Sequence, residues 1–239
     1  MEPAPLTHPC SLVLLPGLDG TGEMFRPLLA ELPGWIRPIV ASYPRDRALA
    51  YAELLPLVAG SLPTGTPHVI LGESFSGPLA VMLARGRPVG LKGIILCASF
   101  VRKPIRAVPS WLSVAAVGPI FRLWPAVLTI RSYPMRKAYP ELLPLALAAI
   151  RSVRPEVVAA RVRALLKVDV QDDLRALDVP LLYLEALRDQ IVRGHNVAGI
   201  REIRPDARVA RIDTRHFLLQ LEPKRAAAEI VSFLETLPA

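Results

Sequence analysis

The sequence predicts an α/β domain in which a mostly parallel sheet carries helices on both faces and a helical segment interrupts the pattern. Short apolar stretches alternate with amphipathic helical patterns over residues 11–100 and again from residue 179 onward. Residues 101–167 contain short helical patterns and no convincing strand. Alternation of this kind is typical of parallel sheets, whose strands are joined by helical crossovers. A chain of 239 residues is long enough to bury the core of one such domain.

Four strands and three helices are expected before residue 101. The expected strands are short apolar runs bounded by turn residues: SLVLLPG (11–17), IRPIVASYP (36–44), HVILGE (68–73) and LKGIILCASF (91–100). Pro38 weakens the second pattern, because proline cannot donate to a strand ladder. The expected helices are TGEMFRPLLAEL (21–32) with Thr21 as its N-cap, ALAYAELLPLVAGSL (48–62) and FSGPLAVMLARG (75–86), closed by Gly86.

The remaining expected elements are the helices of a lid and the second part of the core. We expect lid helices in PELLPLALAAIRSV (140–153) and PEVVAARVRALLK (155–167). Strands follow at VPLLYLEAL (179–187) and ARVARID (207–213), with a helix near 191–203 and a terminal amphipathic helix that has Pro223 in its first turn. The predicted organisation is a core in two parts, 1–100 and 170–239, separated by a helical lid insertion at 101–169.

Composition narrows the function classes. The formal charge of +8 raises the question of a nucleic-acid partner, but the arginines are spread among helical Leu and Ala, which favours a solvated surface. Cys10 and Cys97 have no metal or redox spacing, and Cys97 is expected to be a buried free thiol. The N-terminus lacks the basic region of a signal peptide, and the weakly charged stretch 107–130 is broken by prolines. We therefore expect a cytoplasmic protein with no transmembrane segment and no nucleic-acid partner.

The stretch LGESFSG (71–77) is a near-match to the G-x-S-x-G nucleophile elbow, in which a serine sits on a tight strand-to-helix turn. Ser74 is the candidate nucleophile. Ser76 stands where the second glycine is usual; it adds only a hydroxymethyl group, so we expect strand and helix to sit slightly further apart and Ser76→Gly to leave hydrolysis largely intact. An ordinary Gly-Ser turn is the alternative interpretation.

A serine nucleophile needs a base and an orienting acid. Of the four histidines, only His216 follows a predicted strand, at the carboxyl end of the sheet where the elbow also opens. Asp189 follows the strand before it, whereas Glu185 and Asp213 lie within or at the end of strands and are weaker candidates. The chain order Ser74, Asp189, His216 is that of the α/β-hydrolase triad.

The loop PGLDGTG (16–22) is expected to supply part of an oxyanion hole. Its three glycines permit close backbone approach, and Leu18 N–H is the candidate donor. Phe75 N–H, at the start of the helix after the nucleophile, is the second candidate. A dinucleotide-binding loop is the alternative, but the glycine spacing is not G-x-G-x-x-G.

LLPGLDGTGEMF, LGESFSG, LRDQIV and HFLLQLEP together resemble the α/β-hydrolase superfamily. The first two resemble the hydrolase portion of phytyl ester synthase-type proteins, and the layout is similar to that of small capped bacterial carboxylesterases. The resemblance implies the α/β-hydrolase fold, with Ser74 as nucleophile, His216 as base, Asp189 as acid, and Leu18 and Phe75 as oxyanion donors. The chain departs from many relatives at Pro16-Gly17, where they have His-Gly, and at Ser76.

The lid pattern leaves two interpretations open. Residues 101–167 hold twelve Arg or Lys and two Glu. This charge either forms a landing surface for an acidic acyl carrier or coenzyme A, or is the solvated face of amphipathic helices. The segment also contains the apolar residues Trp111, Phe121, Trp124, Leu128 and Ile130. These side chains either line an acyl pocket or pack the lid against the core.

We therefore expect a serine carboxylesterase that acts on a small-molecule ester and needs no metal or organic cofactor. A thioesterase for a carrier-bound acyl group would use the same triad. A non-catalytic binding protein on a hydrolase scaffold is the alternative from a different class, and the intact triad pattern argues against it.

Overall fold

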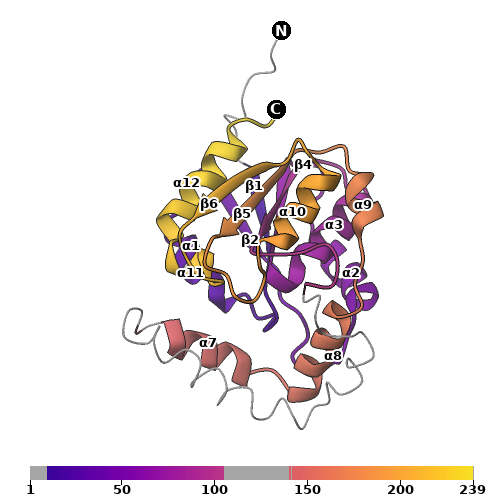
Figure 1. The fold of residues 1–239 in the computed structure, drawn as a ribbon, viewed down its shortest axis with the longest axis vertical. Helices are drawn as coiled ribbons and strands as arrows, with labels where there is room; N and C mark the ends of the chain where they lie inside the picture. Colours follow the sequence, from indigo (N-terminus) through magenta and orange to yellow (C-terminus); the bar gives the residue numbers. More distant parts are fainter. Residues whose placement is uncertain (1–9, 105–139, 141, 239) are drawn as a thin grey trace.

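A computed structural model describes residues 10–104, 140 and 142–238 of the chain. Its centre is a six-stranded sheet in the order β2-β1-β3-β4-β5-β6, with every neighbouring pair parallel (Figure 1). The strands are β1 (Cys10–Leu15), β2 (Ile36–Val40), β3 (His68–Glu73), β4 (Leu91–Cys97), β5 (Leu181–Ala186) and β6 (Arg208–Ile212). Each expected strand is present, so the predicted α/β class is confirmed.

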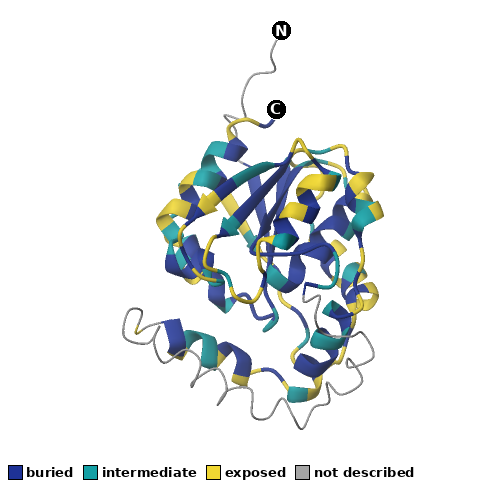
Figure 2. Cartoon of the chain, viewed as in Figure 1, coloured by how far each residue is buried: buried dark blue, intermediate teal, exposed yellow. Residues whose placement is uncertain are grey.

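The position of β2 explains its unusual sequence. β2 lies at the edge of the sheet, where Pro38 pairs in register with Leu12 of β1. Proline is tolerated in edge strands because only one side of the strand must be satisfied by a neighbour. Strands β1 and β3, at the centre of the sheet's first half, are buried along their whole length (Figure 2).

Helices cover both faces of the sheet, and alternate strand residues point to the two layers. Val13 and Leu15 belong to one core, whereas Leu12 and Leu14 belong to the other. On the first face lie α2 (Tyr51–Ala59), α3 (Gly77–Arg85), α9 (Gln171–Arg175) and α10 (His195–Ile203) (Figure 1). On the second face lie α1 (Arg26–Leu29), α11 (Leu218–Leu221) and α12 (Pro223–Leu234). The alternation follows from the period of two in a β-strand.

The single helix expected at 21–32 is wrong in extent. The chain forms a short 3-10 turn, η1 (Glu23–Phe25), and then the four-residue α1. The Thr21 hydroxyl accepts a hydrogen bond from Glu23 N–H at 3.2 Å, so Thr21 does satisfy the start of the turn. Pro27 explains the break, because it has no N–H to continue the hydrogen-bond ladder from the turn before it.

Two helices of the expected lid segment are described, α7 (Leu142–Arg151) and α8 (Pro155–Leu165). They lie together beyond one end of the sheet (Figure 1). Ala149 of α7 packs with Met24, and Val157 and Val158 of α8 pack with Leu18. Helix α8 therefore contacts the loop that follows β1, and α7 contacts η1. The apolar residues proposed for an acyl pocket, between Trp111 and Ile130, lie outside the described residues.

Both cysteines are buried and unpaired, as expected for Cys97. Within the part of the chain that the structure describes, none of the helices combines the length and hydropathy needed to cross a bilayer.

Candidate active site

Ser74 occupies a strained turn between β3 and α3. It begins a short 3-10 turn, η2 (Ser74–Ser76), directly after the strand, and its φ angle is 48°. A non-glycine residue with positive φ is uncommon and stores strain, as a nucleophile elbow requires. A side chain at Gly72 would place its Cβ 2.5 Å from the Ser76 carbonyl oxygen, so strand and helix are too close for any residue but glycine there.

Ser74, His216 and Asp189 form a continuous line of hydrogen-bonding groups. Ser74 Oγ lies 2.9 Å from His216 Nε2, and His216 Nδ1 lies 2.7 Å from Asp189 Oδ2. The other carboxylate oxygen, Asp189 Oδ1, accepts the N–H groups of Ile191 at 2.7 Å and Val192 at 2.9 Å. The Asp189 side chain is 2% exposed. Its carboxylate is therefore fixed by the backbone and directs one oxygen at the imidazole.

The three residues meet because each follows its own strand, at the end of the sheet where the parallel strands have their carboxyl ends. Ser74 comes after β3, Asp189 after β5 and His216 after β6, and the carboxyl ends of parallel strands lie together. Asp189 is placed within a short turn after its strand, and His216 stands just before α11.

The rival residues have other partners. Glu185 pairs with Arg211 at 3.2 Å, and Asp213 pairs with Arg188 at 2.8 Å. The ring of His68 lies 3.0 Å from the Thr66 carbonyl oxygen, at the opposite end of β3 from Ser74. His195 Nε2 lies 3.0 Å from the Pro104 carbonyl oxygen, and His8 lies outside the described residues. Among the described residues, only Asp189 offers its carboxylate to His216.

The loop 16–22 runs beside the elbow. A Cβ built on Gly17 would lie 4.0 Å from Ser74 Cβ, so the backbone that leads to Leu18 passes close to the nucleophile. The Gly17 carbonyl, in the peptide that carries Leu18 N–H, accepts the Gly20 N–H at 3.0 Å. Because the N–H and C=O of a trans peptide point in opposite directions, this bond fixes the direction of Leu18 N–H.

The peptide that carries Phe75 N–H is fixed in the same way. Its carbonyl, that of Ser74, accepts the Ser99 hydroxyl at 2.6 Å. Phe75 is held further by Tyr51, whose hydroxyl donates to the Phe75 carbonyl at 2.7 Å and whose ring stacks on the Phe75 ring at 4.7 Å. Both candidate oxyanion donors therefore belong to peptides whose orientation is set by hydrogen bonds.

Ser76 does more than the sequence suggested. Its side chain is fully buried, and its hydroxyl donates to the Pro16 carbonyl. The Tyr43 hydroxyl lies 2.6 Å from Ser76 Oγ and must donate to it, because the single Ser76 proton is already used. Ser76 therefore ties the elbow to the loop 16–22. These two contacts argue against the expectation that Ser76→Gly leaves hydrolysis largely intact, because glycine would remove both of them. That expectation, and the one of a wider gap between strand and helix, stay predictions.

Solved structures of other proteins share this architecture. No family model and no curated protein matches the sequence. Among solved structures, an enol-lactonase from Burkholderia xenovorans LB400 superposes with a TM-score of 0.80 at 18% identity, covering 97% of this chain and 91% of that one. A thermophilic esterase from Thermogutta terrifontis gives 0.75 at 22% identity, covering 98% and 91%, and a bromoperoxidase from Bacillus anthracis gives 0.78 at 15%, covering 95% and 92%. The chain has the α/β-hydrolase fold.

Within this α/β-hydrolase fold, a buried carboxyl precedes the nucleophile, and sequence reasoning did not single it out. Glu73 is 6% exposed, accepts Gln220 Nε2 at 2.9 Å and a hydrogen bond from the backbone of Gly17. The pKa of Glu73 is raised to about 7, chiefly because the carboxyl is buried. The Gln220 hydrogen bond opposes this rise in pKa, and the nearby Asp19 carboxylate adds to it. Gln220 also donates to the Met24 carbonyl at 3.1 Å, so this pair joins β3, α11 and η1.

The basic segment 101–167 lies only in part within the described residues, and the carrier interpretation stays a prediction. Arg161, counted in the basic charge of the segment, is 1% exposed and therefore adds nothing to an outer landing surface. Most of the other sequence between 101 and 141 lies outside the described residues.

The narrower resemblance to phytyl ester synthase-type proteins also stays a prediction. In the described ranges, no cluster of three His, Cys, Asp or Glu side chains has a geometry suited to a metal ion.

Proposed function

We propose that the protein hydrolyses carboxylic esters of small molecules through an acyl-enzyme on Ser74. The observation that carries the proposal is the line Ser74 Oγ, His216 Nε2, His216 Nδ1, Asp189 Oδ2, with spacings of 2.9 Å and 2.7 Å, built on a serine with φ of 48°. A weak hydroxyl nucleophile becomes reactive when a positioned imidazole removes its proton.

The reaction proceeds in two halves. Ser74 Oγ bonds to the ester carbonyl carbon while His216 Nε2 takes the serine proton, and the carbonyl π electrons move onto oxygen. The N–H groups of Leu18 and Phe75 are proposed to donate to that oxyanion. Collapse expels the alkoxide, which takes the proton from His216 and leaves as the alcohol. Water then attacks the acyl-enzyme with the same base, and the acid departs as Ser74 recovers its proton.

Asp189 has a supporting role in this scheme. Its carboxylate, fixed by two backbone N–H groups, keeps the Nδ1 proton of His216 directed away from Ser74, so that Nε2 is free to accept. The negative charge also stabilises the imidazolium that forms during each half-reaction.

Covalent labelling tests the proposal directly. A fluorophosphonate probe should label the wild-type chain on the peptide that contains Ser74, and nitrophenyl acetate and butyrate should be hydrolysed. Ser74→Ala should lose both the label and the turnover while keeping its unfolding midpoint. A wild-type protein that is folded but takes no label on Ser74 would exclude the acyl-enzyme mechanism, and with it the assignment of this site.

A further inference from the structure

Arg161 of α8 is buried in a place that the proposed mechanism does not use. Arg161 is 1% exposed although its guanidinium carries a charge, and burial lowers the pKa of that group. Taking a charged group out of water costs several kcal/mol unless it is well hydrogen-bonded. The question is what this side chain does from a helix of the expected lid, more than eighty residues beyond the elbow in the sequence.

The partners of Arg161 are backbone carbonyls around the loop 16–22. Arg161 Nη1 donates to the carbonyls of Leu18 at 2.9 Å and Asp19 at 2.7 Å, and Nη2 donates to that of Pro44 at 3.0 Å. The guanidinium also lies over the Tyr43 ring, 5.5 Å from its centre. A planar, multi-donor cation is suited to gather several carbonyls in this way, and a lysine could not reproduce the fork.

The loop is shaped to receive this side chain. Gly20 has φ of +67°, and a Cβ there would lie 2.6 Å from Arg161 Nη1 and 2.8 Å from a Tyr43 ring carbon. Glycine is thus the residue that permits both the backbone conformation and the approach of the guanidinium. The Gly20 carbonyl in turn accepts Tyr43 N–H at 2.8 Å.

These contacts complete the support of the candidate oxyanion donor. Ser76 holds the Pro16 carbonyl on one side of the Gly17–Leu18 peptide, and Arg161 holds the Leu18 carbonyl on the other side. We propose that Arg161 is a positioning residue, by which the lid helix α8 holds the oxyanion loop so that Leu18 N–H faces the developing charge. This inference rests on the proposed function, and it makes one helix of the lid part of the catalytic support rather than only a cover.

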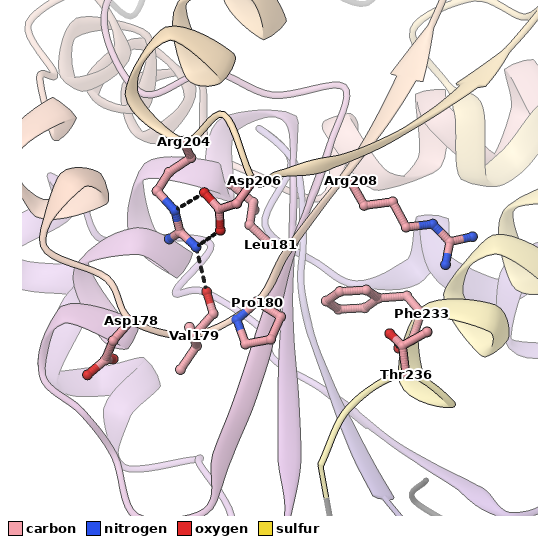
Figure 3. Close-up of a pocket in the computed structure, with 9 residues that line it drawn as sticks. All are labelled: Asp178, Val179, Pro180, Leu181, Arg204, Asp206, Arg208, Phe233 and Thr236. Atoms are coloured by element: carbon pink, nitrogen blue, oxygen red, sulfur yellow. Dashed lines mark hydrogen bonds and ion pairs between the residues drawn. The ribbon is translucent and has the colours of Figure 1, made fainter. Parts of the chain in front are cut away.

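A matched control exists at the opposite end of the sheet. Arg204 is 8% exposed and donates to the carbonyls of Leu177 at 3.2 Å and Val179 at 2.9 Å, besides its ion pair with Asp206. It lines a pocket of about 320 Å³ together with residues at the amino ends of β5 and β6 (Figure 3). Arg204→Ala therefore removes a buried, carbonyl-binding guanidinium without touching the proposed active site.

The test compares Arg161→Ala with Arg204→Ala on nitrophenyl butyrate. We expect Arg161→Ala to lower kcat by about 10- to 100-fold with little change in KM, because misdirecting an oxyanion donor weakens transition-state binding. Arg204→Ala should keep kcat within about twofold of wild type. Guanidinium chloride, far below denaturing concentration and against equal sodium chloride, should restore several-fold activity to Arg161→Ala alone.

Two results would overturn the inference while leaving the proposed function intact. One is an Arg161→Ala enzyme with kcat equal to that of Arg204→Ala. The other is a loss of activity that follows the unfolded fraction and shows no guanidinium rescue, which is the behaviour of a purely structural arginine. If Arg161→Ala does not fold, Arg161→Lys decides: a tenfold loss of kcat in the folded protein supports positioning, and a kcat within about twofold of wild type refutes it. A wild-type protein that takes no label on Ser74 refutes the proposed function instead.

Discussion

Removing the Ser76 hydroxyl should weaken both the fold and the reaction. In Ser76→Ala the Pro16 carbonyl and the Tyr43 hydroxyl lose a shared buried partner. Leaving a buried polar group unsatisfied costs about 1–3 kcal/mol, so two such groups should lower the free energy of unfolding by about 2–6 kcal/mol. The loop 16–22 also loses its tie to the elbow, and we expect kcat to fall by about tenfold.

A double-mutant cycle gives the sharpest version of this test. Tyr43→Phe alone removes one hydrogen bond, but in the Ser76→Ala background it removes a donor that already lacks a partner. Its cost should therefore be smaller there, with a coupling energy of about 1 kcal/mol or more. Urea unfolding of the four proteins measures the coupling, and initial rates with nitrophenyl butyrate measure kcat. Additive single-mutant costs, together with an unchanged kcat in Ser76→Ala, would refute the reasoning.

Three further predictions follow from the same contacts. Asp189→Asn should lower kcat by about 10⁴-fold, because the reactive tautomer of His216 is lost, whereas Glu185→Gln should keep a kcat near that of wild type. A loss of kcat in Glu185→Gln alone would show that Glu185, and not Asp189, is the orienting acid. Burial raises the pKa of Glu73 from 4.5 to about 7, so the folded state holds a proton that the unfolded state releases across this window. The free energy of unfolding should then fall as pH rises from 4.5 to 7, by on the order of 3 kcal/mol from this group, and Glu73→Gln should remove that fall. Urea unfolding below, within and above the window measures it, and parallel curves for the two proteins would contradict the prediction. Gly77→Ala would place a Cβ 1.8 Å from Ser99 Oγ, so we expect a loss of about 1–3 kcal/mol in stability. Only part of it should return in Gly77→Ala/Ser99→Ala, because the new Cβ still lies 2.8 Å from the Cβ of residue 99 and the hydrogen bond to the Ser74 carbonyl is lost; an unchanged unfolding midpoint in the single variant would count against the close contact.

The sequence predicts much of this fold because the strands have short, uninterrupted apolar runs. The order of Ser74, Asp189 and His216, each after its own strand, also follows from the pattern, since parallel strands bring their carboxyl ends together. Where the pattern was ambiguous, as at the helix expected over 21–32, a single proline decided the outcome.

The supporting contacts were beyond sequence reasoning for a physical reason. The side chains of Ser99, Tyr51 and Arg161 donate to backbone carbonyls. A carbonyl is present at every residue and carries no sequence signature. Arg161 lies 143 positions from Leu18, and in the sequence it is one arginine among many. Its burial, which sets it apart from a solvated surface arginine, is visible only once α8 is packed against the loop.

Pro38 has a consequence for how copies of this protein behave beside one another. It lies in β2, where the sheet ends, and it is exposed there next to the exposed Arg37. An open strand offers its free N–H and C=O groups to any other strand that approaches, which is how sheets join into larger assemblies. Because Pro38 has no N–H to offer and Arg37 adds a repelling charge between copies, this border of the sheet is poorly suited to pairing with another chain, and crowded molecules should remain separate along it.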